Sequence, residues 1–222
     1  MISHQVPAGA AVVAAAAMAV LAPAVNAAAA AAPAPGRTVR ASPALALAPT
    51  NPDAAGWDAR NVYFSGNPRV LFTSPWYSGV GRHMLPFGCT PAPYYARSAA
   101  CAYRSGFHHG VDMAVRTGTV IKAGYAGRIL DGSTMGPAYG ANRFRLRATV
   151  NGVTKDFLIG HTAKNYVKVG QWVTAGQVMA VAGASGAPDG THLHLEVRPV
   201  NGGLASAQNP YPYGRFAAVG SL

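Results

Sequence analysis

Acidic residues are scarce in this sequence. Seven Asp and Glu residues stand against eighteen Lys and Arg in 222 residues, and Glu196 is the single glutamate. A glycosidase needs two carboxyl groups that flank the bond it cleaves, and the sequence offers no obvious pair. The shortage therefore argues against glycosidase chemistry and leaves few candidates for any mechanism built on paired carboxylates.

The same shortage gives the chain a formal net charge of +11. Arg37 is the first Lys, Arg, Asp or Glu in the sequence, so the positive charge belongs to the part of the chain that follows. Such a charge suits an anionic partner, either a nucleic acid or a polymer that carries phosphates and carboxylates. No nucleic-acid-binding motif accompanies the charge, so we expect no nucleic-acid partner.

No hydrophobic run in the sequence is as long as a membrane span. The Ala-rich run over residues 9–22 falls short of the roughly 20 apolar residues that cross a bilayer, so no stable transmembrane anchor is expected. Val25 and Ala27 are small residues at the positions that a signal peptidase reads, which predicts a signal peptide over residues 1–27 and export of the protein. The segment before the run lacks Lys and Arg, which leaves a disordered Ala-rich tail as the alternative.

Residues 28–55 are rich in Ala and Pro and show no periodic apolar face. This composition is typical of an extended or flexible linker. The remaining length accommodates one domain, which we place at residues 56–222.

Cysteine is nearly absent, and no Cys-x-x-Cys metal motif occurs. The two cysteines, Cys89 and Cys101, flank a loop rich in Pro, Tyr and Ala. In an oxidising compartment a disulfide would close this loop and stabilise the fold by roughly 3 kcal/mol. We predict that disulfide, with two buried thiols as the alternative.

Glycine interrupts the chain every few residues after about residue 107, between short runs of Val, Ile, Leu and Phe. The pattern predicts many short strands and a mainly β fold, an antiparallel sandwich barrel. Similar glycine corners in residues 118–129 and 169–183 are found in lipoyl- and biotinyl-type carrier barrels. A carrier needs a lysine in a Met-Lys hairpin tip, which this sequence lacks.

The clearest element is a hairpin in which Asn151-Gly152 joins residues 143–150 to residues 153–160. This dipeptide best tolerates positive φ at both turn positions. The register pairs Val150 with Val153, Arg147 with Asp156, Leu146 with Phe157, and Phe144 with Ile159. If the alternation continues, His161 lies on the buried side at the end of the strand.

Histidine carries most of the candidate chemistry, and one pair lies in an alternating apolar segment. Residues two apart in a strand share a face, so His192, His194 and Glu196 project together while Leu193 and Leu195 face the core. A histidine pair flanked by apolar residues is costly to bury unless it has partners.

The first histidine motif along the chain is His108-His109-Gly110-Val111-Asp112. A straight strand would hold the α-carbons of His108 and Asp112 roughly 13 Å apart, near the limit for sharing one ion. We therefore expect the chain to bend at Gly110, because glycine has no side chain to restrict the backbone.

Two imidazoles and one carboxylate are a usual ligand set for catalytic zinc, with the fourth position left for water or substrate. A neighbouring group must still accept and return protons, and His161 and His192 are the candidates. No His-Glu-x-x-His motif is present, and Glu196 could instead orient a metal ligand.

The order of these motifs resembles that of LytM/lysostaphin-type zinc endopeptidases, over about residues 80–214. The motifs that carry the resemblance are His108-x-Gly110-x-Asp112, Gly160-His161, Val167-Lys168-Val169-Gly170-Gln171 and Gly190-Thr191-His192-Leu193-His194-Leu195-Glu196-Val197-Arg198. The resemblance implies one zinc ion held by His108, Asp112 and His194, with His161 and His192 as the catalytic pair. It also implies hydrolysis of a peptide bond in the stem or cross-bridge of peptidoglycan.

The sequence departs from the family pattern at three places. Ile159-Gly160 precedes the histidine where Tyr-Ala is frequent, Thr191 replaces a common Pro, and residues 89–101 form an insertion ahead of the first ligand. None of these changes removes a ligand. If the motif were aligned one residue later, His109 would take the place of His108 as the first ligand. The spacing to Asp112 favours His108, with His109 as an exposed neighbour.

The resemblance implies an exported monomer that acts in the cell envelope, where anionic polymers would attract its positive charge. Substrate preference would depend on residues 89–101 and on the loop over residues 133–142. The aromatic residues that could line a groove are Trp76, Tyr77, Tyr94, Tyr95, Tyr139 and Trp172. The alternative function is a regulator that keeps the ligands, binds the envelope and catalyses nothing.

Overall fold

The computed structural model describes residues 57, 67–102, 105–187 and 189–222. The signal peptide and the linker predicted over residues 1–27 and 28–55 lie outside these residues. Trp57, just after the predicted linker, is buried against Met84 and Ala114. The guanidinium of Arg82 lies 4.4 Å from the centroid of the Trp57 ring, so Trp57 packs as a part of the domain.

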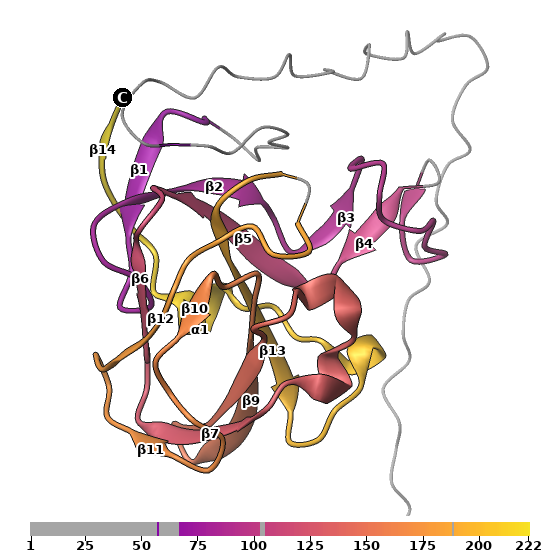
Figure 1. Cartoon of the computed structure of the whole chain (residues 1–222). Coiled ribbons are helices and arrows are strands. Elements are labelled where there is room, and N and C mark those ends of the chain that lie inside the picture. Colours follow the sequence, from indigo (N-terminus) through magenta and orange to yellow (C-terminus); the bar gives the residue numbers. More distant parts are fainter. Residues whose placement is uncertain (1–56, 58–66, 103–104, 188) are drawn as a thin grey trace, which may run out of the picture. The chain divides into compact units, whose positions relative to one another are not determined.

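Most strands belong to one large antiparallel sheet. Among the described residues it contains, in spatial order, β11 (Trp172–Val173), β7 (Gly127–Asp131), β8 (Phe144–Val150), β9 (Val153–Gly160), β13 (His192–Pro199), β5 (Gly110–Val115), β2 (Gly81–Leu85), β1 (Val70–Thr73) and β14 (Ala217–Ser221). The long strands β9 and β13 run side by side through the middle of the domain (Figure 1).

Two smaller sheets complete the fold. The first contains β10 (Lys164–Asn165), β12 (Val178–Val181) and β6 (Val120–Lys122), and the second pairs β3 (Gly88–Thr90) with β4 (Gly106–His108). One hydrophobic core unites Ile121 of β6 and Met179 of β12 with Phe157 and Leu195 of the large sheet. Two sheets therefore pack face to face across one core, and the predicted mainly β, antiparallel fold is confirmed.

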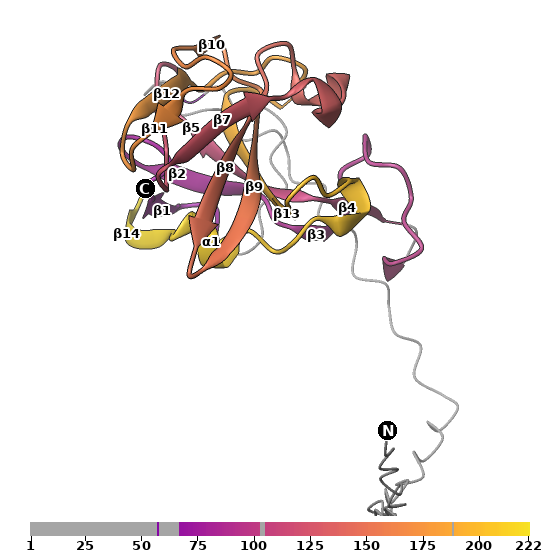
Figure 2. The same cartoon turned by 90° about the horizontal axis from the view of Figure 1, so that it is seen from below.

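The predicted hairpin is confirmed residue by residue. β8 and β9 pair with Val150 opposite Val153, and every cross-strand pair named from the sequence is present. Asn151 and Gly152 both have positive φ, at 50° and 78°, as a two-residue hairpin turn requires. Figure 2 shows the two strands side by side as long neighbouring arrows.

Asp156 is the buried carboxylate of this hairpin. It accepts hydrogen bonds from Arg147 Nε at 2.7 Å and Arg145 Nη1 at 3.3 Å, and from the backbone N–H of Asn201 at 3.1 Å. Burial opposes ionisation, but these donors hold the pKa of Asp156 below its usual value. The interaction ties the hairpin to the segment that follows β13.

We expect Asp156→Asn to lower the free energy of unfolding by about 2 kcal/mol at pH 7, because a buried charge-assisted pair is broken. A group with a depressed folded-state pKa stabilises only above its unfolded-state pKa. The difference from wild type should therefore be complete above about pH 5 and shrink as the pH falls below 4. Urea unfolding from pH 3 to 7 measures it, and a difference that grows on acidification would contradict this account.

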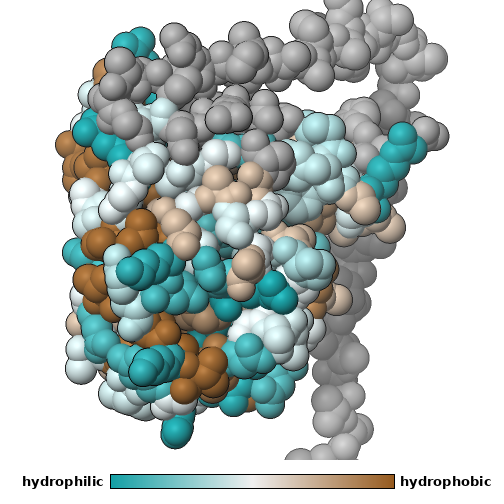
Figure 3. All heavy atoms as spheres, in the orientation of Figure 1, coloured by the Kyte–Doolittle hydropathy of each residue, from teal (hydrophilic) through white to brown (hydrophobic). Residues whose placement is uncertain are grey.

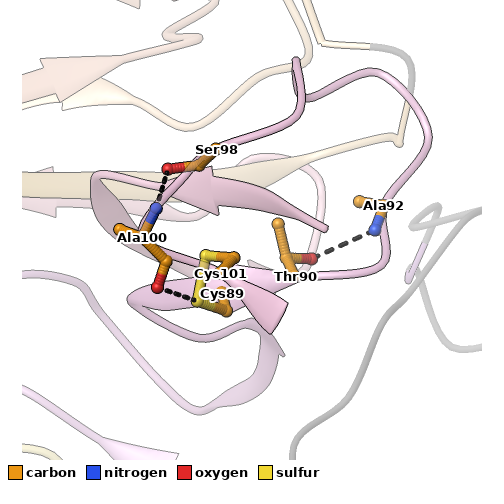
Figure 4. The surroundings of a disulfide bond; sticks show 6 residues. All are labelled: Cys89, Thr90, Ala92, Ser98, Ala100 and Cys101. Carbon is orange, nitrogen blue, oxygen red and sulfur yellow. Dashed lines mark hydrogen bonds between the residues drawn. A yellow bond between two sulfur atoms is a disulfide. The ribbon is translucent and has the colours of Figure 1, made fainter. Parts of the chain in front are cut away.

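The predicted disulfide between Cys89 and Cys101 is present (Figure 4). Within the loop, Ser98 Oγ accepts the N–H of Ala100 and Thr90 Oγ1 accepts the N–H of Ala92, both at 3.2 Å. The bridge closes the segment that joins β3 to β4, immediately before the first histidine motif. This places a covalently closed loop beside His108.

Helical structure is limited to single turns in the described residues: α1 (Tyr211–Gly214), η2 (Ser133–Met135), η3 (Pro137–Tyr139) and η4 (Leu204–Ser206). No helix in this part of the chain has the length and apolar character needed to cross a membrane. Apolar side chains reach the surface on several strands, among them Trp172 of β11, which is 65% exposed. In Figure 3 hydrophobic (brown) residues alternate with white and teal ones along the left edge.

Candidate metal centre

The pairing of β5 with β13 brings the second histidine pair to the Asp112 carboxylate. His194 lies directly opposite Asp112, and His192 lies opposite Ala114. Leu193 and Leu195 face the hydrophobic core, so the predicted division of β13 into a polar face and an apolar face is confirmed.

Three donor atoms converge on one point of this polar face. His108 Nε2 lies 3.3 Å from His194 Nδ1 and 3.4 Å from Asp112 Oδ1, and the last two atoms are 2.8 Å apart. All three residues are buried, and they form a group able to hold a metal ion. The structure thus brings together the three residues that the sequence analysis proposed as ligands.

The donor set fits zinc. Ligand atoms about 2.0–2.1 Å from a tetrahedral zinc ion lie roughly 3.3 Å from one another, which matches two of the three observed separations. His108 Nδ1–H donates to the carbonyl of Pro86 at 2.9 Å, so its Nε2 lone pair is free for a metal. Nε2 of His192, a fourth nitrogen nearby, is buried, lies 3.7 Å from Asp112 Oδ1 and has no hydrogen-bond partner among the described residues.

The charges of the group are coupled. Burial disfavours the Asp112 carboxylate, but the neighbouring imidazoles outweigh it and hold the pKa of Asp112 well below its usual range. Burial also opposes the protonation of His194, yet Asp112 raises the pKa of His194 to about 9. A metal ion at Nδ1 would take the place of that proton, since only the deprotonated nitrogen binds metal.

The chain bends at His109, between β4 and β5, and not at Gly110 as expected. Gly110 is the first residue of β5 and lies opposite Glu196. A Cβ on Gly110 would lie 2.6 Å from Cε1 and 2.8 Å from Nε2 of His194. The glycine is needed for space beside a candidate ligand and not for the bend.

We expect Gly110→Ala to weaken zinc binding by about tenfold or more, because the added methyl group displaces the His194 ring. Gly203→Ala is the matched control, since nothing lies within 4 Å of its Cβ position. Competition with a chromogenic chelator gives both dissociation constants. Equal affinities in the two variants would show that the space at Gly110 does not matter.

His161 and His192 lie together beside the three candidate ligands. Their ring centroids are 4.7 Å apart, and the ring of His161 is 5.7 Å from that of His194. Nδ1–H of His161 donates to the carbonyl of Ser185, and Nδ1–H of His192 donates to the carbonyl of Gly190. The Nε2 lone pair of each ring is therefore left free. Burial and the nearby imidazoles lower the pKa of His161 to about 3, so its ring is neutral.

The strand alternation does not continue through His161, contrary to the sequence expectation. Gly160 lies opposite His194 and shares its face, so an extended residue at 161 would point to the other face. His161 instead has a φ of +58°, a left-handed conformation that is uncommon outside glycine. This local reversal returns the ring to the face that carries the candidate ligands.

The group lies in an open groove of about 1290 Å³. Its walls include residues 94–100 of the disulfide loop, parts of the loop over residues 134–139, and residues 201–205 and 207. Tyr94, Tyr95 and Tyr139 line the groove as proposed, whereas Trp76 and Tyr77 are core residues and Trp172 is not among the lining residues. His109 is half-buried in the groove wall against Phe107, not exposed as expected.

The sequence analysis named Glu196 but missed its two partners. Arg198 Nε donates to Glu196 Oε1 and the hydroxyl of Tyr139 donates to Glu196 Oε2, both at 2.5 Å. Arg198 shares a strand face with Glu196, which was a signal in the sequence. Tyr139 is remote along the chain, and nothing local to it reveals the contact.

Comparison with known proteins shows similarity to a peptidase family. Residues 106–210 match the model described as "Peptidase family M23". Lysostaphin of Staphylococcus staphylolyticus is 34% identical over 116 residues, which are 52% of this chain and 23% of lysostaphin. Glycyl-glycine endopeptidase ALE-1 of Staphylococcus capitis is 31% identical over 116 residues, 52% of this chain and 31% of that protein. The match thus spans less than a third of the length of these curated relatives.

A solved structure of the catalytic domain of lysostaphin from Staphylococcus simulans is similar to 57% of this chain. The similarity covers 88% of that catalytic domain, with 31% sequence identity and a TM-score of 0.45.

Proposed function

We propose that the protein is a zinc-dependent endopeptidase that hydrolyses peptide bonds in peptidoglycan stems or cross-bridges. The match of residues 106–210 to the peptidase family M23 model and the similarity to lysostaphin support this proposal. The observation that carries the proposal is the convergence of His108 Nε2, Asp112 Oδ1 and His194 Nδ1 within 3.4 Å of one another in an open groove.

In this proposal His108, Asp112 and His194 hold one zinc ion. When bound, zinc lowers the pKa of a water molecule and polarises an amide carbonyl. His161 and His192 supply the proton transfers that hydrolysis needs, through Nε2 lone pairs that their Nδ1–H bonds leave free. Each ring is held by a backbone carbonyl, which fixes the nitrogen that faces the reaction.

The proposed substrate follows from the relatives and from the charge of the chain. ALE-1 is named as a glycyl-glycine endopeptidase, and the net charge of +11 suits a wall rich in carboxylates and phosphates. The proposal includes export through residues 1–27, action as a monomer and nonspecific attraction to anionic envelope polymers. The bond cleaved depends on the groove walls, which include the insertion over residues 89–101.

Digestion of purified peptidoglycan tests the proposal. We expect new amino and carboxyl termini in the muropeptides, detected by mass spectrometry on walls of several chemotypes. His192→Ala should lower the rate by about 10²–10⁴-fold, as expected for loss of a proton-transfer group, and His108→Ala should abolish hydrolysis.

His109→Ala is the matched control, because His109 adjoins His108 but is not in the group of converging donors. It should retain zinc binding and most of the activity. Identical fragments from wild type, His108→Ala and His192→Ala would refute the enzyme assignment. Zinc binding by wild type without any turnover would support the inactive regulator instead.

A further inference from the structure

One nitrogen of the candidate ligand His194 lacks a hydrogen bond within the described part of the chain. Its Nδ1 faces Asp112 and His108, and its Nε2 is buried without a hydrogen-bond partner among the described residues. If Nδ1 binds a metal ion, the proton of the neutral ring resides on Nε2. A buried N–H group that lacks an acceptor costs about 1–3 kcal/mol, so an acceptor beside Nε2 would favour the metal-binding form.

The carboxylate of Glu196 is a candidate acceptor. Its Oε2 lies 3.6 Å from His194 Nε2, and the residue is completely buried. A Cβ on Gly110, the residue opposite Glu196, would lie 2.8 Å from the same Nε2, so the glycine leaves room beside that nitrogen. A small rotation of either side chain would close the gap to hydrogen-bond distance.

Glu196 is held in place from its far side. Arg198 Nε donates to Oε1, the Tyr139 hydroxyl donates to Oε2, and Arg198 Nη2 donates to the Tyr139 hydroxyl at 3.1 Å. The three side chains form a closed triangle of hydrogen bonds. Such a triangle fixes the direction of the carboxylate and balances its charge in a buried site.

Tyr139 also contacts the site in two further ways. Its ring packs edge-on against the His194 ring, with centroids 5.2 Å apart and planes at 80°. Its backbone carbonyl accepts the N–H of His161 at 2.8 Å. One residue thus supports a candidate ligand, the acceptor beside that ligand and a candidate catalytic histidine.

We propose that Glu196, fixed by Tyr139 and Arg198, is a positioning residue that accepts the Nε2–H of His194 and holds its Nδ1 toward the metal. The inference rests on the proposed zinc centre and extends it to Tyr139, which lies outside the family motifs quoted above, and to Glu196 and Arg198 within them. A carboxylate behind a ligating histidine fixes the tautomer and the ring orientation and makes the ligand more basic. Glu196 therefore acts through His194 and does not touch substrate.

The dissociation constant for zinc, measured on the full chain by competition with a chromogenic chelator, tests this directly. We expect Glu196→Gln to raise it by about 10- to 100-fold, the usual effect of losing such a partner. Tyr139→Phe removes one hydroxyl without changing charge, and it should raise the constant by about three- to tenfold.

Two controls match these changes. Asp131→Asn removes an exposed carboxylate that accepts a hydrogen bond from the backbone N–H of Ser133. Tyr166→Phe removes the hydroxyl of an exposed tyrosine. Both should stay within about twofold of wild type. Because Glu196→Gln leaves Arg198 buried without its ion pair, urea unfolding of the metal-free variants measures folding separately. Tyr139→Phe keeps the test decisive if Glu196→Gln does not fold.

A purely structural role would not produce coupling between the two positions. If Tyr139 acts through Glu196, the double variant should bind zinc about as weakly as Glu196→Gln alone. Zinc affinity within twofold of wild type in folded Tyr139→Phe and folded Glu196→Gln would overturn the inference and leave the enzyme assignment standing. A wild-type chain that binds no zinc would overturn both, whereas zinc binding without hydrolysis would overturn the enzyme assignment alone.

Discussion

The antiparallel register between β5 and β13 is the constraint on which the site depends. It sets Asp112 opposite His194 and, on the same two strands, directs Leu193 and Leu195 into the core. A slip of one residue would exchange the two faces, exposing the leucines and burying the histidines in the hydrophobic core. The burial of apolar side chains therefore enforces the same register that brings the candidate ligands together.

The site is costly to build, and its surroundings reduce that cost. Several titratable groups are buried within a few ångströms of one another. Each needs a hydrogen-bond or charge partner to offset the free energy that its burial costs. Asp112 compensates His194 and His108, while Arg198 and Tyr139 compensate Glu196. The arrangement forms two layers, in which the inner layer presents lone pairs to a metal and the outer layer holds the inner one in place.

The elements that the sequence predicted are those governed by local rules. The hairpin around Asn151 follows from turn chemistry and strict alternation, and the polar face of β13 follows from alternation alone. The reversal at His161 and the contact of Tyr139 with Glu196 depend on tertiary packing, which the local sequence pattern does not reveal. Gly110 was recognised as special, but for the bend and not for the space it leaves beside His194. The signal peptide, the linker and the roles of individual site residues stay predictions.

The central claim is that a single zinc ion is shared by residues from three strands, β4, β5 and β13. Anomalous X-ray diffraction on both sides of the zinc absorption edge, from crystals of the zinc-loaded protein, measures this most directly. The account predicts one strong peak about 2.0–2.2 Å from His108 Nε2, Asp112 Oδ1 and His194 Nδ1. A peak bound by His161 and His192 without Asp112, or the lack of any peak in the groove, would contradict it.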